Sequence, residues 1–417
     1  MDLIVRQGRR RGEERACDIG IENGTIAAVE PAIRGRAARE IDAAGRLVTP
    51  PLVNPHVHLD KALLGAVMRP NRSQTLQEAI EITCDFKRHY TEQDIVERAG
   101  AVLEMAIREG TLVVRGFADV GTVGGLMPVR GLLATRARYR GLVTMEIVAF
   151  PQEGLVRDPG AEPLLREAMA LGADVVGGLP WYELTDEDAR RHIDIVFAIA
   201  RERDADVHML VDDTDDANSR SLEYLAVKTL REGWGGRVTA SHCGALAAYN
   251  ATYAAKVVAL VKEAGITIVS NPHISVVPAG RRDAEPVRRG ITRVRELLQA
   301  GVNVASGQDD VDDPYYPFGR SSQLEVALFM AHTAHLTYPD ELETVFDMVT
   351  INAARAMRLP RYGLAPGDAG DLLVWDAAGV KEALTRQRPP AHVVRSGLEV
   401  ARTTVTSELT LPGAANG

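Results

Sequence analysis

Cysteine is scarce in this sequence, with three residues in 417, at positions 17, 84 and 243. An odd number of widely spaced cysteines predicts neither a disulfide framework nor a cysteine-based zinc site. The sequence also lacks a run of about 18 apolar residues, and its start carries no basic segment followed by an apolar core. We therefore expect a cytoplasmic protein that has no membrane partner.

Basic residues are also fewer than acidic residues in this sequence. The 48 lysines and arginines are outnumbered by 57 acidic residues, which gives a net charge of −9 at pH 7. Proteins that bind nucleic acids usually present a basic face. The charge balance therefore disfavours a nucleic-acid partner and favours a small-molecule substrate.

The chain does contain a repeated pattern of short apolar runs, each followed by a longer stretch with helical spacing, such as 92–109 and 190–201. This alternation is typical of βα units around a parallel sheet. Eight such runs favour an α/β fold of the (β/α)8 TIM barrel type over an open doubly wound sheet. The predicted strands are 47–57, 112–118, 142–150, 174–179, 206–211, 238–242, 266–270 and 302–306.

The two ends of the chain have a different pattern, because short alternating strands separated by turns fill 1–46 and 363–410. We expect both termini to pair into one small β-sandwich. The predicted domains are therefore the sandwich, from 1–50 and 360–417, and the barrel, from 51–359.

Four polar residues lie at the ends of predicted strands: His56 and His58 at the close of the first, His242 at the end of the sixth and Asp309 after the eighth. Histidine and aspartate are ligands that hold a divalent metal. Two histidines two residues apart on a strand share one face and can converge on one ion. The carboxyl ends of barrel strands are where such folds place working residues, so the four predict a metal centre.

Several segments resemble the amidohydrolase superfamily, and within it the branch of cytosine deaminase and N-isopropylammelide hydrolase. The resemblance covers nearly the whole chain. It is carried by PPLVNPHVHLDK (50–61), FPQEG (150–154), GADVVGGLP (172–180), SH (241–242), RRGITRV (288–294) and DDVDDPYYP (309–317).

The resemblance implies one zinc or iron ion held by His56, His58, a histidine on the fifth strand and Asp309. It also implies that a glutamate three residues after the fifth-strand histidine moves protons, and that His242 acts on the attacking oxygen. Relatives form homo-oligomers, and we expect one here. No lysine occurs in 174–180, so the carboxylated-lysine bridge of binuclear relatives is not expected.

The fifth strand departs from the family pattern His-x-Asp-Glu-x-Asp-Asp, since this chain reads DVHMLVDDTDD over 206–216. An ungapped match puts Leu210 at the ligand position and Asp213 at the glutamate position, with His208 about 6.6 Å deeper along the strand. A gapped match keeps His208 as the ligand and leaves Asp212 or Asp213 near the proton-transfer position. With Leu210 there, two histidines and an aspartate remain, His242 can serve as a fourth donor, and the metal is held more weakly.

The predicted reaction is hydrolysis of a C–N bond in a cyclic amide or amidine, such as a pyrimidine or triazine. Asp309 and Asp213 would transfer protons and His242 would stabilise the developing oxyanion. Ring opening on the same scaffold and a metal-poor protein that binds a heterocycle without hydrolysis are the alternatives. The predicted substrate-binding residues are Gln152, Lys61, Trp181, Asp310 and Tyr315.

Overall fold

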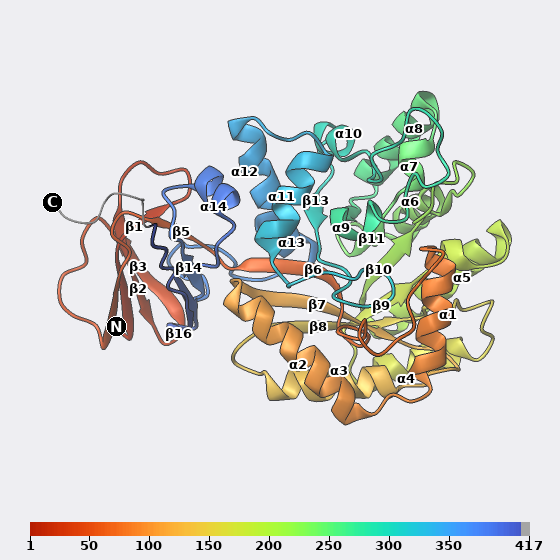
Figure 1. Cartoon of the computed structure of the whole chain (residues 1–417), viewed down its shortest axis with the longest axis horizontal. Coiled ribbons are helices and arrows are strands. Elements are labelled where there is room, and N and C mark those ends of the chain that lie inside the picture. The colour runs from red at the N-terminus through yellow and green to blue at the C-terminus, as the bar shows by residue number, and fades with distance from the viewer. Residues whose placement is uncertain (410–417) are drawn as a thin grey trace.

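The computed structural model describes residues 1–409 and contains a barrel and a smaller β domain (Figure 1). Eight parallel strands pair in sequence order around the barrel. They are β6 (Leu52–His58), β7 (Thr111–Asp119), β8 (Thr144–Phe150), β9 (Val175–Gly178), β10 (Asp206–Val211), β11 (Val238–His242), β12 (Thr267–Ser270) and β13 (Val304–Ser306). The predicted eight-stranded barrel is confirmed.

Helices surround the barrel (Figure 1). Those that follow strands around it are α2 (Glu92–Arg108), α3 (Met127–Arg138), α4 (Ala161–Leu171), α5 (Asp186–Arg203), α6 (Ser221–Glu232), α8 (Ala251–Glu263), α10 (Val294–Gln299) and α11 (Gln323–Thr333). Extra helices are α1 (Leu76–Lys87), η1 (Pro180–Tyr182), α7 (Ala245–Ala248), α9 (Pro272–Ser275), α12 (Pro339–Met348), α13 (Ile351–Ala356) and α14 (Val380–Arg386).

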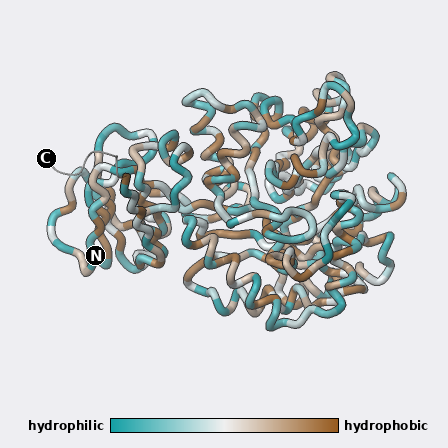
Figure 2. Tube along the Cα trace, viewed as in Figure 1, coloured by the Kyte–Doolittle hydropathy of each residue, from teal (hydrophilic) through white to brown (hydrophobic). Residues whose placement is uncertain are grey.

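The strands are apolar on both faces because the barrel interior and the helix layer both exclude water. Every residue of β6 and of β7 is buried. The brown segments of Figure 2 mark hydrophobic residues, which concentrate along the strands and on parts of the helices. At the amino-terminal end of the barrel, Val53 and Val113 pack against Ala353 and Met357 of α13 and its C-cap, so this end is filled.

The barrel closes between its first strand and the segment after β13. The amide of Asp309 donates to the carbonyl of His56 at 2.8 Å, and the amide of His58 donates to the carbonyl of Asp309 at 3.0 Å. These two hydrogen bonds form a parallel bridge between Val57 and Asp309. The closure therefore fixes three of the predicted site residues relative to one another through the backbone.

The predicted first strand, 47–57, is wrong in one respect: it is two strands. Pro50 and Pro51 interrupt it, because proline has no amide hydrogen to donate to a sheet. The part before them, β5 (Leu47–Thr49), pairs with strands of the β domain. The part after them is β6 of the barrel.

The β domain takes strands from both ends of the chain. Strand β1 (Leu3–Arg10) pairs with β2 from Leu3 to Gly8, with β4 through its first half and with β5 through its second half. Gln7 lies at the irregularity between these halves with φ +51°. The other strands are β2 (Cys17–Glu22), β3 (Thr25–Glu30), β4 (Arg39–Asp42), β14 (Leu372–Val374), β15 (His392–Arg395) and β16 (Leu398–Arg402).

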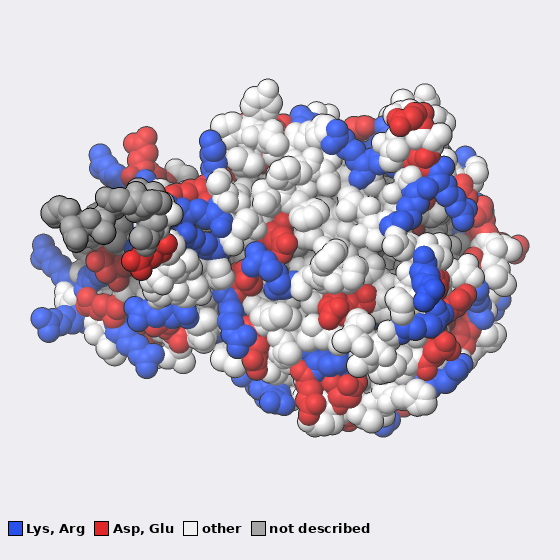
Figure 3. Space-filling view, in the orientation of Figure 1, with Lys and Arg blue, Asp and Glu red and all other residues white. Residues whose placement is uncertain are grey.

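The domain bounds of 1–50, 51–359 and 360–417 stay a prediction, and positions 410–417 lie outside the described residues. Within the described chain, no helix has the length and apolar character needed to cross a bilayer. Acidic and basic side chains are interspersed over the face shown in Figure 3.

Candidate functional site

Three of the predicted ligands converge at the carboxyl end of the barrel. The Nε2 atoms of His56 and His58 lie 3.3 Å apart, and each lies 3.4 Å from Oδ1 of Asp309. All three side chains are buried. The closure of the barrel described above explains how Asp309 reaches this spacing from His56 and His58, which lie 253 and 251 positions before it in sequence.

This spacing fits a metal ion. Zinc binds imidazole nitrogen and carboxylate oxygen at about 2.0–2.1 Å in tetrahedral geometry, for which neighbouring ligand atoms lie about 3.3–3.4 Å apart. Burial is the main cause that lowers the pKa of His56 and of His58, which favours the neutral imidazole that a metal needs. Burial raises the pKa of Asp309, but the imidazoles of His56 and His242 outweigh it and hold that pKa well below its ordinary range.

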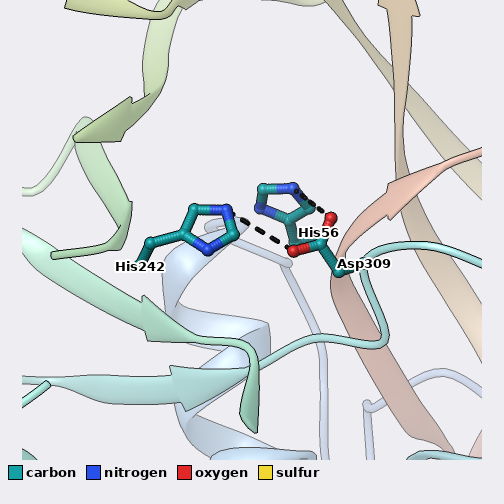
Figure 4. A group of neighbouring side chains, drawn as sticks. All are labelled: His56, His242 and Asp309. Atoms are coloured by element: carbon teal, nitrogen blue, oxygen red, sulfur yellow. Dashed lines mark ion pairs between the residues drawn. The ribbon is translucent and has the colours of Figure 1, made fainter. Parts of the chain in front are cut away.

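His242 faces the same centre from β11. Its Nε2 lies 3.4 Å from Oδ2 of Asp309, and its Nδ1 lies 3.5 Å from Oδ1 of Asp213. Figure 4 shows His56 and His242 directed at the two oxygens of Asp309. Among the described residues, neither nitrogen of His242 has a hydrogen-bond partner at normal distance. The ring is therefore free to act on a ligand at this centre.

Asp212 and Asp213 have different surroundings. The Asp212 carboxylate accepts from the hydroxyl of Ser219 and from the amides of Ser221 and Leu222, so it caps α6. Asp213 lines a pocket beside the centre, and burial raises the pKa of its carboxyl. Of the two aspartates that the sequence left open, Asp213 is the one that faces His242.

His208 does not reach the centre. Its Nε2 lies 2.7 Å from the hydroxyl of Ser241, which lies 2.7 Å from Nδ1 of His56. This geometry disfavours the gapped match, because His208 lies one layer deeper on β10 than the ligands. Leu210 packs instead in an apolar cluster with Phe117 and Phe150, whose rings contact His56 and His58.

Lys61 is committed to partners inside the protein. Its Nζ lies 3.1 Å from Oδ1 of Asp119 and donates to Oε1 of Gln152 at 2.8 Å. Lys87 joins the same cluster, with its Nζ 2.6 Å from Asp119 and 2.6 Å from Glu153. Because an ammonium group only donates, the carboxamide oxygen of Gln152 must face Lys61. Its NH2 group makes no hydrogen bond within the described chain and is left to donate to a ligand.

A pocket of about 460 Å³ lies beside the centre, next to Asp213, whose Oδ1 is 3.5 Å from Nδ1 of His242; His56, His58, His242 and Asp309 are not among its walls. Asp213 and Tyr315 are among its walls, together with α1 residues and the loop after α9. Lys61 lies 5.2 Å from the centroid of the Tyr315 ring. Trp181, in η1, packs in the apolar cluster of Leu210 and does not line this pocket. Asp310 is buried beside the centre, with Oδ1 unpaired among the described residues.

The sequence interpretation missed Asp119, Lys87 and Ser241. A signal existed for Asp119, since it ends β7 at the carboxyl end of the barrel, but the predicted strand stopped one residue short of it. Ser241 directly precedes His242 and was not singled out for a role. Lys87 lies on α1, an insertion between β6 and α2 that the βα pattern did not predict.

The chain is similar to several known proteins. Residues 91–406 match the amidohydrolase family. The solved structure of 5-methylcytosine deaminase from Klebsiella pneumoniae, liganded with 5-fluorocytosine, has a TM-score of 0.93 and 36% identity, covering 98% of this chain and 99% of that one. N-isopropylammelide isopropylaminohydrolase from Burkholderia multivorans has a TM-score of 0.84 and 30% identity over 96% and 99%. Pterin deaminase from Rhizobium rhizogenes is 30% identical over 92% of this chain and 88% of its own.

Proposed function

Because the chain belongs to the amidohydrolase family, we propose that it hydrolyses a non-peptide C–N bond in a cyclic amide or amidine heterocycle such as a pyrimidine or triazine. The observation that carries this proposal is the convergence of His56, His58 and Asp309 at 3.3–3.4 Å. The relatives named above support the choice of heterocycle, since their names identify a methylcytosine, an N-isopropylammelide and a pterin.

His56, His58 and Asp309 would hold one divalent ion, zinc or iron, with His242 as the nearest further donor. A divalent ion at such a site lowers the pKa of a water molecule and so supplies a nucleophile near neutral pH. Leu210 of β10 packs among apolar side chains, so this position of β10 offers no fourth donor to the ion. We therefore propose that the ion is held more weakly than in a site with a β10 histidine.

Two carboxyl groups on opposite sides of His242, those of Asp309 and Asp213, transfer the protons. Asp309 accepts the proton released as water attacks the ring carbon. Asp213, whose carboxyl has its pKa raised by burial, donates to the ring nitrogen or the leaving amine. His242 lies between these carboxylates and donates to the oxygen that gains charge.

Gln152 would orient the substrate through its NH2 group, because its oxygen is held by Lys61. A substrate then needs an acceptor, such as a ring carbonyl, on the side that faces Gln152. Tyr315 would contact the ring as a wall of the pocket. Lys61 acts through Gln152 in this proposal, while Asp310, which lies beside His58 and Asp309, and Trp181, which packs in the apolar cluster of Leu210, remain proposed substrate contacts.

The test combines metal analysis with product analysis. Protein purified without added metal is assayed for bound zinc and iron, and then for activity on cytosine, 5-methylcytosine, N-isopropylammelide and pterin. We expect about one ion per chain after zinc is supplied and release of an amine or ammonia from at least one substrate. A H56A/H58A double variant should lose both, whereas H332A, on the exposed side of α11, should keep both.

Each alternative gives a different outcome in this test. A ring-opened product without amine release would identify a cyclic amidohydrolase. Ligand binding by a protein that takes up no metal and hydrolyses nothing would falsify the proposal and identify a metal-poor binding protein.

We also propose a cytoplasmic homo-oligomer that binds neither nucleic acid nor membranes. The net charge of −9 and the family membership support this proposal. Light scattering of the purified chain tests its oligomeric part, and a monomer at micromolar concentration would contradict it.

A further inference from the structure

A buried carboxylate holds the loop that carries Gln152. Glu183 directly follows η1, and its side chain is fully buried. Its Oε1 accepts from the amides of Leu155 at 2.6 Å and Val156 at 3.0 Å. Its Oε2 accepts from the amide of Arg157 at 2.8 Å. The three amides lie in the loop after β8, so this carboxylate binds that loop to the connection after β9.

His192 of α5 is the fourth partner of the Glu183 carboxylate. Its Nε2 accepts from the amide of Leu179 at 3.1 Å, because a backbone amide can only donate. The hydrogen of the neutral ring is therefore on Nδ1, which donates to Oε1 of Glu183 at 2.7 Å. Burial outweighs the carboxylate and lowers the pKa of His192, which favours this neutral ring. Four donors thus face an ionised carboxylate, which offers about four lone-pair sites.

Gly154 lets the loop close around this carboxylate. It has φ +93°, and a Cβ at this position would lie 2.9 Å from Oε1 of Glu183, too close for a side chain. The amide of Gly154 donates to the carbonyl of Pro151 at 3.0 Å, and the amide of Gln152 donates to the carbonyl of Phe150 at 3.0 Å. The backbone at Gln152 is therefore held by β8 on one side and by Glu183 on the other.

The side chain of Gln152 makes one hydrogen bond within the described chain, with Nζ of Lys61. That bond fixes the carboxamide at one end of the side chain, and the backbone fixes the other end. We propose that Glu183, together with His192, is a positioning residue that holds the loop 151–157 so that the NH2 group of Gln152 meets the substrate. This inference rests on the proposed function, in which Gln152 orients the heterocycle.

The first test is E183Q in the zinc-loaded protein. A glutamine oxygen can replace one carboxylate oxygen, but the NH2 group then faces a backbone amide or Nδ1 of His192, so two donors oppose each other. The substrate is whichever of cytosine, 5-methylcytosine, N-isopropylammelide and pterin the unchanged chain hydrolyses. We expect KM to rise about tenfold and kcat to stay within about threefold. Hydrogen exchange read by mass spectrometry should be faster at the amides of 155–157.

A double-mutant cycle with Q152A separates positioning from a structural role. Loss of folded protein lowers the melting temperature and the apparent kcat but leaves KM unchanged. In the Q152A chain the positioned group is absent, so E183Q should raise KM by less than about twofold. An equal rise of KM in both backgrounds overturns the inference.

Asp18 of β2 provides the matched control. It is a buried carboxylate that accepts from the amides of Gln7 and Ile33, each at 3.0 Å, and from Arg6 at 2.8 Å, but it lies in the β domain. D18N should lower the melting temperature and leave KM within about twofold, because it is remote from Gln152. The same rise of KM in D18N as in E183Q would contradict a specific role of Glu183.

His192 provides a second pair of variants. H192L removes one of the four donors and should raise KM in the same direction as E183Q. In H192Q, the NH2 group can donate to Glu183 and the oxygen can accept from Leu179, so most of the loss should be recovered. If E183Q does not fold, this pair carries the test, and equal KM values in H192L and H192Q then refute the inference.

Failure of this inference and failure of the proposed function give different results. An active chain in which E183Q keeps its KM refutes the inference alone. If the unchanged, zinc-loaded chain hydrolyses none of the four heterocycles, the proposed function fails, and the inference fails with it.

Discussion

Backbone conformation at single residues aims the side chains at the centre. His242, Cys243 and Asp309 have φ values of +67°, +51° and +65°. Non-glycine residues adopt this left-handed region at a cost, and folded proteins retain it mostly where function needs it. Here it turns the chain directly after β11 and β13, so that His242 and Asp309 point across the barrel mouth and not along their strands.

At the same scale, Asp213, which follows β10 and has a shorter side chain than the glutamate of the family pattern, can be tested against its neighbours. We expect D213N to lower kcat by about a hundredfold to ten-thousandfold, because an amide cannot donate and recover a proton as a carboxyl does. Zinc affinity should stay within about threefold, since Asp213 contacts His242 and not the three ligands. Steady-state kinetics and chelator competition measure the two quantities.

The control for this prediction is D216N, an exposed aspartate of the same loop, which should keep full kcat. D213E restores the longer side chain of the family and should retain much more activity than D213N. If D213N keeps its kcat, Asp213 does not transfer the proton.

Among the elements, α1 forms part of the pocket wall. It lies between β6 and α2, and its residues Leu76 and Ala79 form part of the pocket wall. Thr75 caps its first turn by accepting from the amide of Glu78 at 3.2 Å. Thr91 caps α2 in the same way, at 3.2 Å from the amide of Asp94, but α2 does not line the pocket.

This pair allows a matched comparison of elements. T75A and T91A should each lower the free energy of unfolding by about 1 kcal/mol, the usual effect of removing a threonine cap. Only T75A should also raise KM, by a few fold, because fraying of α1 loosens the pocket wall. Urea unfolding and substrate titration check both parts. A KM change of the same size in T91A would argue against a specific role of α1.

At the scale of the whole molecule, the sequence predicted what depends on periodic burial and missed what depends on particular side-chain contacts. Apolar runs gave all eight barrel strands, because a strand buried on both faces leaves a strong signal. The ligand positions followed from strand ends. The sequence did not predict the cluster of Lys61, Lys87 and Asp119, because the cluster unites three segments whose spacing in sequence carries no periodic signal.

The fifth strand shows the same limit. Two alignments of 206–216 were open because a shift of two residues keeps every side chain on the same face of a strand. Only the contacts of Ser241 with His56 and His208 distinguish them. The break at Pro50 and Pro51 was within reach of the sequence, since adjacent prolines rarely continue a strand.

Stability of the whole chain should respond to pH through His273, on α9. Its ring is buried, stacks on Phe329 at 4.4 Å between centroids, and has no hydrogen-bond partner among the described residues. Burial lowers its pKa from 6.5 to about 4. Between these values the unfolded chain binds more protons than the folded chain, so stability is fully present above pH 6.5 and falls as the pH falls toward 4.

The variant H273F keeps the stacked ring and removes the titration. Between pH 7.5 and pH 5, the free energy of unfolding of the unchanged chain should therefore fall by about 2 kcal/mol more than that of H273F. Urea unfolding at both pH values measures this difference. H332F, which replaces an exposed histidine of α11, should follow the unchanged chain. Parallel curves for H273F and the unchanged chain would show that His273 titrates normally and that α9 opens to solvent.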